Sequence, residues 1–459
     1  MLTLHLGEDD INAPLQAEDG INRLVELGLV RLETENAIRS HRLVIAFVCD
    51  VLGDKVNKGR QTVEITIDKE ATRINKIGNP ALLVAWQSHL RFVANVALRR
   101  EDLSAAKLCN ELGLHLAQAG DFPESKLYFE AALAIRREKL GEEHPDTAQS
   151  YDRLGFALRA SGKFDEAGLC FQQALTIRET VLGEEHNDTA ISLNELGRWY
   201  EERGDLILAK EYYKRALSIS LKVLGETHPL TAEYLNNVGI SLVEIGELVE
   251  AESYFHQAFT INEAIFGVEH PDTAMNLNNL GYLHQNAGNP IKAQDYHQQA
   301  LAIRKSILGR DHPDTAQSMS NLGIALRDQG QLNQAQHYLE TALTIRETVL
   351  GKDHPRTAIC LDHLGLLLQD LGEIDAAWNY FERALAVRRA ALGTNHPKTA
   401  DSLDHLGHLL FDLGDSDTAR IYVEQALAIR QKTLGENHPL TVQTLKDLIS
   451  LSPTQPSII

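Results

Sequence analysis

The chain is poor in cysteine, has no long apolar run and carries no excess of positive charge. Its four cysteines (Cys49, Cys109, Cys170 and Cys360) are scattered over 459 residues without a CxxC pair. This spacing argues against a disulfide framework and predicts reduced thiols in a cytoplasmic protein. No stretch approaches the roughly 18–20 apolar residues of a membrane-spanning helix, so we expect no membrane partner. The first ten residues contain three acidic residues and no basic one, which is unlike a secretory signal.

Motifs of catalysis and nucleotide binding are also missing. The sequence contains no GxSxG, no HExxH and no GxxxxGK[ST] phosphate loop, and paired carboxylates lack a supporting context. Single Asp, His and Ser residues recur with an internal repeat, which explains them better than catalysis does. We therefore predict a protein that is not an enzyme and that needs no cofactor.

The net charge of −20 is concentrated in one part of the chain. Residues 1–102 carry 13 Lys and Arg against 15 Asp and Glu, whereas the remainder carries 31 against 49. A nucleic acid would meet a repulsive field there, which argues against it as a ligand. A basic or neutral peptide is the better match, although net charge bears on association more than on identity.

The phrase Leu-Gly-x-x-His-Pro-x-Thr-Ala organises the rest of the chain. It reads Leu140 to Ala148 and returns every 42 residues without an insertion or deletion, with its eight histidines at 144, 186, 228, 270, 312, 354, 396 and 438. A fixed period of this length is typical of a solenoid, in which each unit buries its apolar face against its neighbours.

The phrase itself predicts the loop that ends one unit and the helix start of the next. Pro145 and its equivalents suit a first helical position, where the missing N–H costs nothing, and Asp146 suits the first turn of a helix. In the third unit Asn187 replaces the proline, so we expect a slightly looser helix start. A shared metal is excluded because equivalent histidines in adjacent units lie on the order of 10 Å apart, whereas zinc ligands lie about 2 Å from the ion.

Each unit predicts two helices around a turn glycine. The first helix centres on a Leu-Gly pair such as Leu154-Gly155, and the second carries two alanines seven apart, such as Ala167 and Ala174, with an aromatic residue between them. This pattern resembles the tetratricopeptide repeat (TPR), and the 42-residue length resembles the repeats of kinesin light chains and of related STAND proteins. The resemblance implies an all-α, right-handed superhelix of eight helix pairs over residues 103–438, a capping helix over 439–451 and a tail over 452–459.

Residues 1–54 do not follow the repeat. The pattern predicts a short helix over 17–27, a hairpin over 29–40 and a helix over 41–52. This order, with the residues Leu24 to Val30 and Ser40 to Val44, resembles the winged helix of STAND signalling ATPases (the NB-ARC type). The resemblance implies that His41 is a vestigial nucleotide-sensing residue, although Arg42 replaces the acidic residue of that motif. A DNA-reading winged helix is disfavoured because the stretch has no excess of positive charge.

Residues 55–102 predict a helical adaptor that caps the first repeat. We expect its helices over 59–77 and 80–98, with Asn79-Pro80 at their junction. The adaptor would cover an apolar edge that otherwise faces water.

The TPR resemblance implies that two positions before each Leu-Gly pair line a concave groove. Asparagine is concentrated at these positions in the middle units, and a carboxamide both donates and accepts hydrogen bonds, so a ladder of them could hold an extended peptide. The alternative is that they are ordinary solvated helix residues, but asparagine is a mediocre helix former. The predicted groove residues are Asn194, Asn236, Asn237, Asn278, Asn279, Tyr282, Gln285, Ser320, Asn321 and Arg327. The asparagine of a chaperone-type carboxylate clamp is absent from the position after the Leu-Gly pair, so a C-terminal EEVD tail is not the expected ligand.

One unit departs from its own pattern at two positions. His284 stands where the other units have Leu or Tyr, and His297 takes the aromatic position of the second helix. In the TPR fold the two positions pack near each other, which predicts a hydrogen-bonded polar pair. A metal site or a pH-sensitive site is the alternative.

Together these features predict a scaffold that binds a protein or peptide partner. The alternative is the sensor portion of a split or truncated STAND signalling ATPase, whose nucleotide domain would lie upstream or on another chain. A cargo adaptor like a kinesin light chain would require an N-terminal heptad coiled coil, and none is visible. The sequence does not define the oligomeric state.

Overall fold

The computed structural model describes residues 30–34, 37–40, 54–77 and 81–451. Within these ranges the chain forms one hairpin and nineteen helices. The hairpin pairs β1 (Val30–Thr34) with β2 (Ala37–Ser40) in antiparallel order, as predicted. His41 and the two helices predicted beside the hairpin lie outside the described residues, so the winged helix stays a prediction.

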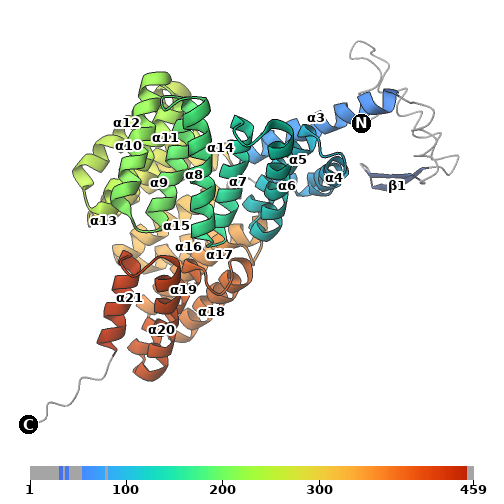
Figure 1. Ribbon diagram of the computed structural model, residues 1–459. Coiled ribbons are helices and arrows are strands. Elements are labelled where there is room, and N and C mark those ends of the chain that lie inside the picture. The colour runs from blue at the N-terminus through green and yellow to red at the C-terminus, as the bar shows by residue number, and fades with distance from the viewer. Residues whose placement is uncertain (1–29, 35–36, 41–53, 78–80, 452–459) are drawn as a thin grey trace, which may run out of the picture.

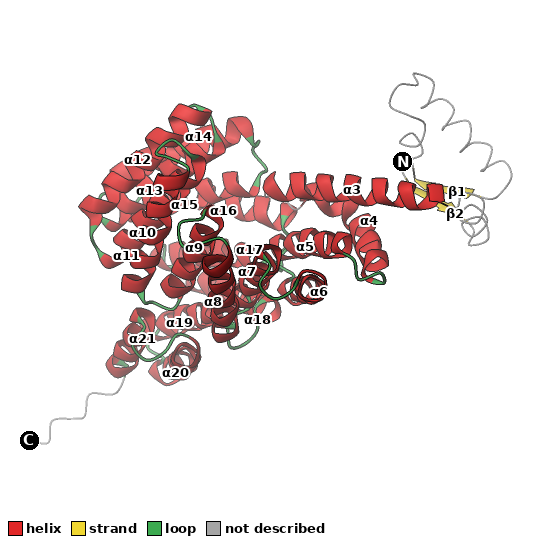
Figure 2. Cartoon of the chain, turned by 45° about the horizontal axis from the view of Figure 1, so that its top comes forward, coloured by secondary structure: helices red, strands yellow, loops and turns green. Residues whose placement is uncertain are grey.

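Two helices precede the repeats. The predicted adaptor helices are present as α3 (Asp54–Ile77), which begins five residues before its expected start, and α4 (Ala81–Leu98). Both contact α5 (Leu103–Gln118), and α3 lies across the end of the solenoid (Figure 2). Ile74 and Leu90 are buried in one cluster with Leu108 and Leu112. The pair therefore covers the apolar edge of the first repeat.

Eight helix pairs follow in the predicted register. Each pair is a first helix and a second helix of one unit, and the last pair is followed by α21 (Pro439–Ser450). The pairs are α5 with α6 (Phe122–Leu140), α7 (Pro145–Ala160) with α8 (Phe164–Val181), α9 (Asn187–Glu202) with α10 (Leu206–Val223), α11 (Pro229–Ile245) with α12 (Leu248–Phe266), α13 (Pro271–Asn286) with α14 (Pro290–Ile307), α15 (Pro313–Asp328) with α16 (Leu332–Val349), α17 (Pro355–Asp370) with α18 (Ile374–Ala391), and α19 (Pro397–Asp412) with α20 (Ser416–Thr433).

The repeated phrase ends one unit and starts the next by local hydrogen bonds. The His144 ring precedes helix α7, and its Nδ1 accepts from the backbone N–H of Asp146 at 3.0 Å, so the histidine is the N-cap. Thr147 donates from its hydroxyl to the carbonyl of Gly141 at 2.8 Å, which closes the loop. Gly141 has φ of 95°, a left-handed value that favours glycine. Proline at the first helical position is confirmed in every unit that carries it.

Small residues let the two helices of a unit approach closely. The Phe171 ring of α8 lies on Gly155 of α7, where an added Cβ would stand 2.7 Å from the ring. The same contact recurs between Gly113 and Phe129 and between Gly365 and Phe381. Glycine is therefore required at this position by packing, because any side chain would displace the ring.

The first helices form the inner side of the solenoid. Consecutive first helices contact one another, as α11 does with α13 and α13 with α15, whereas consecutive second helices lie further apart. Stacked units that are closer on one side must curve toward that side. We call the surface formed by the first helices the inner face.

The curvature brings later units back onto earlier ones. In both views α17 lies beside α7 (Figures 1 and 2). His354, which precedes α17, places its Nε2 3.1 Å from the carbonyl oxygen of Gln118 at the end of α5. These residues are 236 positions apart, which at 42 residues per unit is 5.6 units. We call this line of contact between successive turns the seam.

The seam repeats three times in register. His396 bonds to the carbonyl of Ala160, and His438 bonds to that of Glu202. The three rings pack against the turn glycines Gly120, Gly162 and Gly204. One motif thus has two environments: His144 caps its helix from a position that is 40% exposed at the side chain, whereas His354 is 6% exposed and also joins the turns.

Candidate functional site

The two predicted groove positions are paired across units on the inner face. The first position of one unit faces the second position of the next, 43 residues later. Asn237 donates from Nδ2 to Oδ1 of Asn194 at 2.6 Å, and Asn279 donates to Oδ1 of Asn236 at 3.0 Å. Two further pairs continue the series toward the C-terminus, Ser320 with His363 at 2.9 Å and Asp362 with His405 at 3.4 Å.

Half of the predicted groove residues are buried between units. Asn236 is 2% exposed, and its Oδ1 accepts from both Asn276 and Asn279. The expectation that these side chains stand free in a groove does not hold for them, because close packing of consecutive first helices covers the position. The buried set is Asn194, Asn236, Asn237, Asn278 and Ser320. The half-exposed set is Asn279, Tyr282, Gln285, Asn321 and Arg327.

A column of buried arginines, which we did not single out from the sequence, explains part of this pattern. Arg178 of α8 is buried and donates to Asp152 of its own unit at 2.5 Å and to Ser192 of the next unit at 2.6 Å. Such a pair needs good geometry and satisfied hydrogen bonds to offset its desolvation. We call each such meeting of one second helix with two first helices a node. The equivalent buried arginines are Arg136, Arg178, Arg304, Arg346, Arg388 and Arg430.

Two middle nodes are neutral. The arginine position holds Ser220 and Asn262, and the position 26 residues earlier, which is Asp152 opposite Arg178, holds Asn194 and Asn236. A carboxylate stands opposite only three of the six arginines, as Asp152, Asp362 and Asp404, whereas Arg136, Arg304 and Arg346 face the neutral Asn110, Asn278 and Ser320. At the two nodes without arginine no carboxylate is present, so no buried charge is left unpaired there. A role in ligand binding is a separate question.

A second row of polar pairs lies nearer the solvent. Gln285 donates from Nε2 to Oδ2 of Asp328 at 2.8 Å, and Arg327 pairs with Asp370 of the next unit. Tyr282 reaches back and donates from its hydroxyl to Glu244. Three predicted groove residues are thereby held in place at the inner face with part of each side chain accessible.

The two unusual histidines have different partners. The His284 ring stacks on Tyr296 at 5.4 Å between centroids, and its Nε2 lies 3.6 Å from Glu252. His297 is fully buried, and its Nδ1 lies 3.0 Å from Oδ1 of Asn278. The predicted pairing of the two histidines is therefore wrong. Burial lowers the pKa of His297 to about 4, so its ring is neutral at physiological pH.

A pocket of 340 Å³ opens on the inner face beside His297. It is lined by Tyr282, Gln285, His297, Asn321 and Ile324, together with Asn286. Three of these are predicted groove residues, so the structure brings them together at one place. The pocket arises where the aromatic series of the second helices is interrupted, with His297 in one unit and Leu339 in the next.

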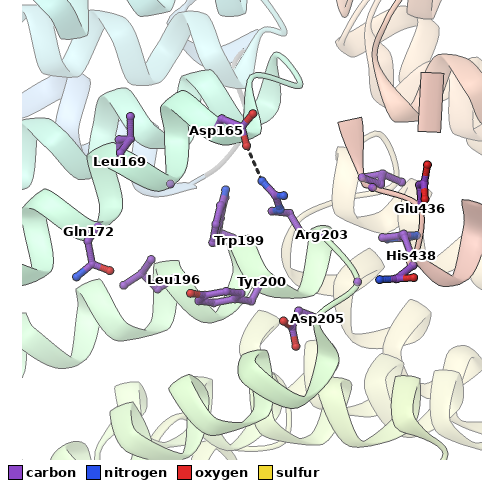
Figure 3. A pocket seen from close by; sticks show the side chains of 15 residues that line it. Asp165, Leu169, Gln172, Leu196, Trp199, Tyr200, Arg203, Asp205, Glu436 and His438 are labelled. Carbon is purple, nitrogen blue, oxygen red and sulfur yellow. Dashed lines mark hydrogen bonds and ion pairs between the residues drawn. The ribbon is translucent and has the colours of Figure 1, made fainter. Parts of the chain in front are cut away.

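A larger pocket, of 770 Å³, lies at the seam (Figure 3). Trp199, Tyr200 and Arg203 form one wall, and the loop that ends at His438 forms another. Its prominent polar groups are already paired: Trp199 Nε1 donates to the carbonyl of Phe164 at 2.7 Å, and Arg203 lies 2.6 Å from Asp165. We therefore consider it a gap between turns and regard the smaller pocket as the candidate site.

Other kinds of site find no support among the described residues. No group of three or more His, Cys, Asp or Glu side chains is placed to hold a metal ion there. The three cysteines in that part of the chain are free and buried. Within the same ranges, none of the helices has the length and apolarity to cross a membrane.

Comparison with known proteins places the repeats in a family. The sequence pattern of the tetratricopeptide repeat family matches eight overlapping stretches from residue 103 to residue 448. No curated protein matches the chain. A putative kinesin light chain of Podosopora anserina with nearly identical TPR-like repeats is 25% identical over 45% of this chain and 98% of its own, with a TM-score of 0.37.

Two further solved structures extend the comparison. BtubC (BKLC) from P. vanneervenii is 23% identical over 51% of this chain and 92% of its own, with a TM-score of 0.41. A Rap protein complexed with competence and sporulation factor is 14% identical over 82% of this chain and 99% of its own, with a TM-score of 0.53. This last likeness shows a shared fold. Given the family match over three quarters of its length, the chain belongs to the tetratricopeptide repeat family.

Proposed function

We propose that the protein is a non-enzymatic scaffold that binds an extended peptide or partner segment along the inner face of α11 to α15. The observation that carries this proposal is the pocket beside His297, where Tyr282, Gln285 and Asn321 converge. Each of these side chains is half-exposed. Preorganised polar groups of this kind bind with little loss of side-chain entropy.

The buried asparagines have a supporting part in this proposal. Asn236 fixes the half-exposed Asn279 through its hydrogen bond at 3.0 Å, whereas the pair of Asn194 and Asn237, at 2.6 Å, is buried on both sides. The buried asparagines support the inner face without contacting a ligand themselves. The peptide-binding set is therefore narrowed to Asn279, Tyr282, Gln285, Asn321 and Arg327.

The charge of the inner face favours a neutral or basic partner. Glu244, Asp328 and Asp370 lie in the solvent-side row of pairs, and the repeats carry most of the net negative charge. An acidic peptide would be repelled there. The Rap protein, which shares the fold, was crystallised with competence and sporulation factor, and this supports the idea that a solenoid of this size can hold a partner.

An affinity pull-down tests the proposal. The wild type is compared with a Tyr282→Ala/Asn321→Ala variant, which removes two accessible inner-face side chains, and with Val249→Ala. Val249 lies on the second helix α12 and is 87% exposed, so its loss should change neither fold nor binding. We expect the double variant to lose proteins that the other two retain; equal recovery by all three would refute inner-face binding.

The alternative, the sensor part of a STAND signalling ATPase, stays a prediction. The hairpin β1–β2 is compatible with a winged helix, but the residues that would define it lie outside the described ranges. Co-purification of a nucleotide-binding partner with the wild type, lost on deletion of residues 1–54, would favour this role.

A further inference from the structure

The pocket beside His297 contains a buried hydrogen-bond acceptor without a partner. His297 is 0% exposed, and its Nε2 has no hydrogen-bond partner among the described residues. Leaving such a group unsatisfied costs about 1–3 kcal/mol. The same nitrogen lies beside Gly281, where an added Cβ would stand 2.7 Å away, so a donor must approach it from the pocket side to satisfy it.

The neighbours of the ring decide which of its nitrogens carries the proton. Asn278 donates from Nδ2 to Oγ of Ser318 at 2.9 Å, so its Oδ1 faces the imidazole at 3.0 Å. An amide oxygen only accepts, and Nδ1 of His297 must therefore be the protonated nitrogen. Nε2 is left with a lone pair and requires a donor from the ligand.

Two other residues of the pocket use one half of the side-chain amide in a hydrogen bond within the protein and leave the other half available to a ligand. Asn321 accepts at Oδ1 from Gln317 at 2.7 Å, which leaves its Nδ2 to donate. Gln285 donates from Nε2 to Asp328 at 2.8 Å, which leaves its Oε1 to accept. The pocket thus offers two acceptors and one amide donor on walls that also include the apolar side chain of Ile324.

We propose that this pocket binds the side-chain carboxamide of a glutamine or asparagine in the partner peptide. The NH₂ group of the carboxamide donates to Nε2 of His297 and to Oε1 of Gln285, and its oxygen accepts from Nδ2 of Asn321. A volume of 340 Å³ is at the low end for ligand pockets, which suits one side chain. A cationic ligand is disfavoured because the positive charge of the buried Arg304 already lowers the pKa of His297 and would repel a second positive charge at this ring. The proposal rests on the proposed function, since the pocket is part of the same inner face.

A small probe tests the pocket independently of any partner. N-acetyl-L-glutamine N-methylamide is titrated into protein labelled with ¹⁵N-histidine, and N-acetyl-L-methionine N-methylamide, which has a side chain of similar length and contains no primary carboxamide, is the control. We expect the His297 Nε2 resonance to shift saturably with the first probe only. No shift with the glutamine probe, or an equal shift with both probes, overturns the proposal; a pocket filled only by water gives the former result.

Two variants complete the design. His297→Phe removes the acceptor and restores the residue found at this position in other units, such as Phe255 and Phe381, so the fold should be retained. We expect it to lose at least 10-fold in affinity for the glutamine probe, followed by saturation-transfer NMR. His284→Leu also restores the repeat pattern but lies outside the pocket, and its affinity should equal that of the wild type. Equal affinity in His297→Phe would overturn the proposal.

A random-peptide library separates this inference from the proposed function. If the wild type and His297→Phe select the same peptides without enrichment of glutamine or asparagine, the pocket assignment fails and the scaffold function stands. If the wild type selects glutamine- or asparagine-containing peptides that His297→Phe does not, both are supported. If the wild type retains no peptide, the scaffold function fails, and the probe titration alone decides the pocket.

Discussion

The contribution of the seam contacts to stability can be tested because equivalent histidines without a seam contact provide a control in the same chain. His144, His186 and His228 cap their helices without a seam contact, whereas His354, His396 and His438 cap their helices and also join the turns. Asparagine is a good N-cap residue but is too short to reach the carbonyl across the seam. A His→Asn change therefore preserves the cap at all six positions, and at the three seam positions it also removes the seam bond and the contact of the ring with the turn glycine.

The expected cost follows from the contact that is lost. His354 is 6% exposed and lies 3.1 Å from the Gln118 carbonyl. A hydrogen bond contributes about 0.5–1.5 kcal/mol net, and a buried partner left unsatisfied adds to the loss. We expect about 1–2 kcal/mol for each seam histidine, hence roughly 3–6 kcal/mol for the triple variant if the sites are independent. The control triple should stay close to the wild type.

Denaturant unfolding and small-angle scattering measure the two consequences. The H354N/H396N/H438N variant should unfold at lower denaturant and have a larger radius of gyration, because the C-terminal units are no longer held against the first ones. The H144N/H186N/H228N variant should show neither change. If both triples behave alike, the winding is set by neighbouring units alone, and the seam is only a contact between surfaces that would meet anyway.

Three further predictions follow from packing and charge. Gly155→Ala places a Cβ 2.7 Å from the ring above it and should destabilise the protein by about 1–3 kcal/mol, measured as a lower denaturant midpoint. Asp362→Asn leaves the buried Arg388 unpaired and should cost about 3 kcal/mol; adding Arg388→Ser reproduces a neutral node and should recover most of the loss in the same assay. Burial lowers the pKa of His354 and His396 to about 4, so the unfolded chain binds protons first as the pH falls from 6.5 to 4, and stability should fall by about 2 kcal/mol per histidine at pH 5. The pH slope of the unfolding free energy should be smaller in the seam triple, and an unchanged slope would contradict the assignment.

The helix pairs and their loops were predictable because each depends on local chemistry. The 42-residue period, the turn glycines and the prolines fix where every unit begins and ends, and Pro145 and Gly141 act as their residue types predict. The N-cap role of the histidine also has a local signal, its position directly before proline. The arginine column had a signal too, since six of the eight units have an arginine at the position of Arg178, but its burial against Asp152 depends on packing between helices.

The seam and the burial of Asn236 were not predictable from the period. Equivalent positions of the repeated phrase hold an exposed His186 and a buried His354, and the burial of His354 is created by a unit that lies 236 residues away. Asn236 likewise occupies a position that faces the inner side, and the angle between consecutive units decides whether it meets solvent or a neighbour. That angle results from many side-chain contacts between units, and the repeat pattern alone does not specify these contacts.

Asn278 links the buried network to the candidate site, and its substitution tests that link. In the wild type its Oδ1 lies 3.0 Å from Nδ1 of His297, while its Nδ2 donates to Ser318. An Asn278→Asp change places a carboxylate against the ring and favours the imidazolium form, which raises the pKa of His297. Once Nε2 carries a proton it donates instead of accepting, so the pocket should lose affinity for N-acetyl-L-glutamine N-methylamide and gain affinity for N-acetyl-L-glutamate N-methylamide. The pocket shape is nearly unchanged by this substitution, so an unaltered preference between the two probes would show that His297 does not select the ligand.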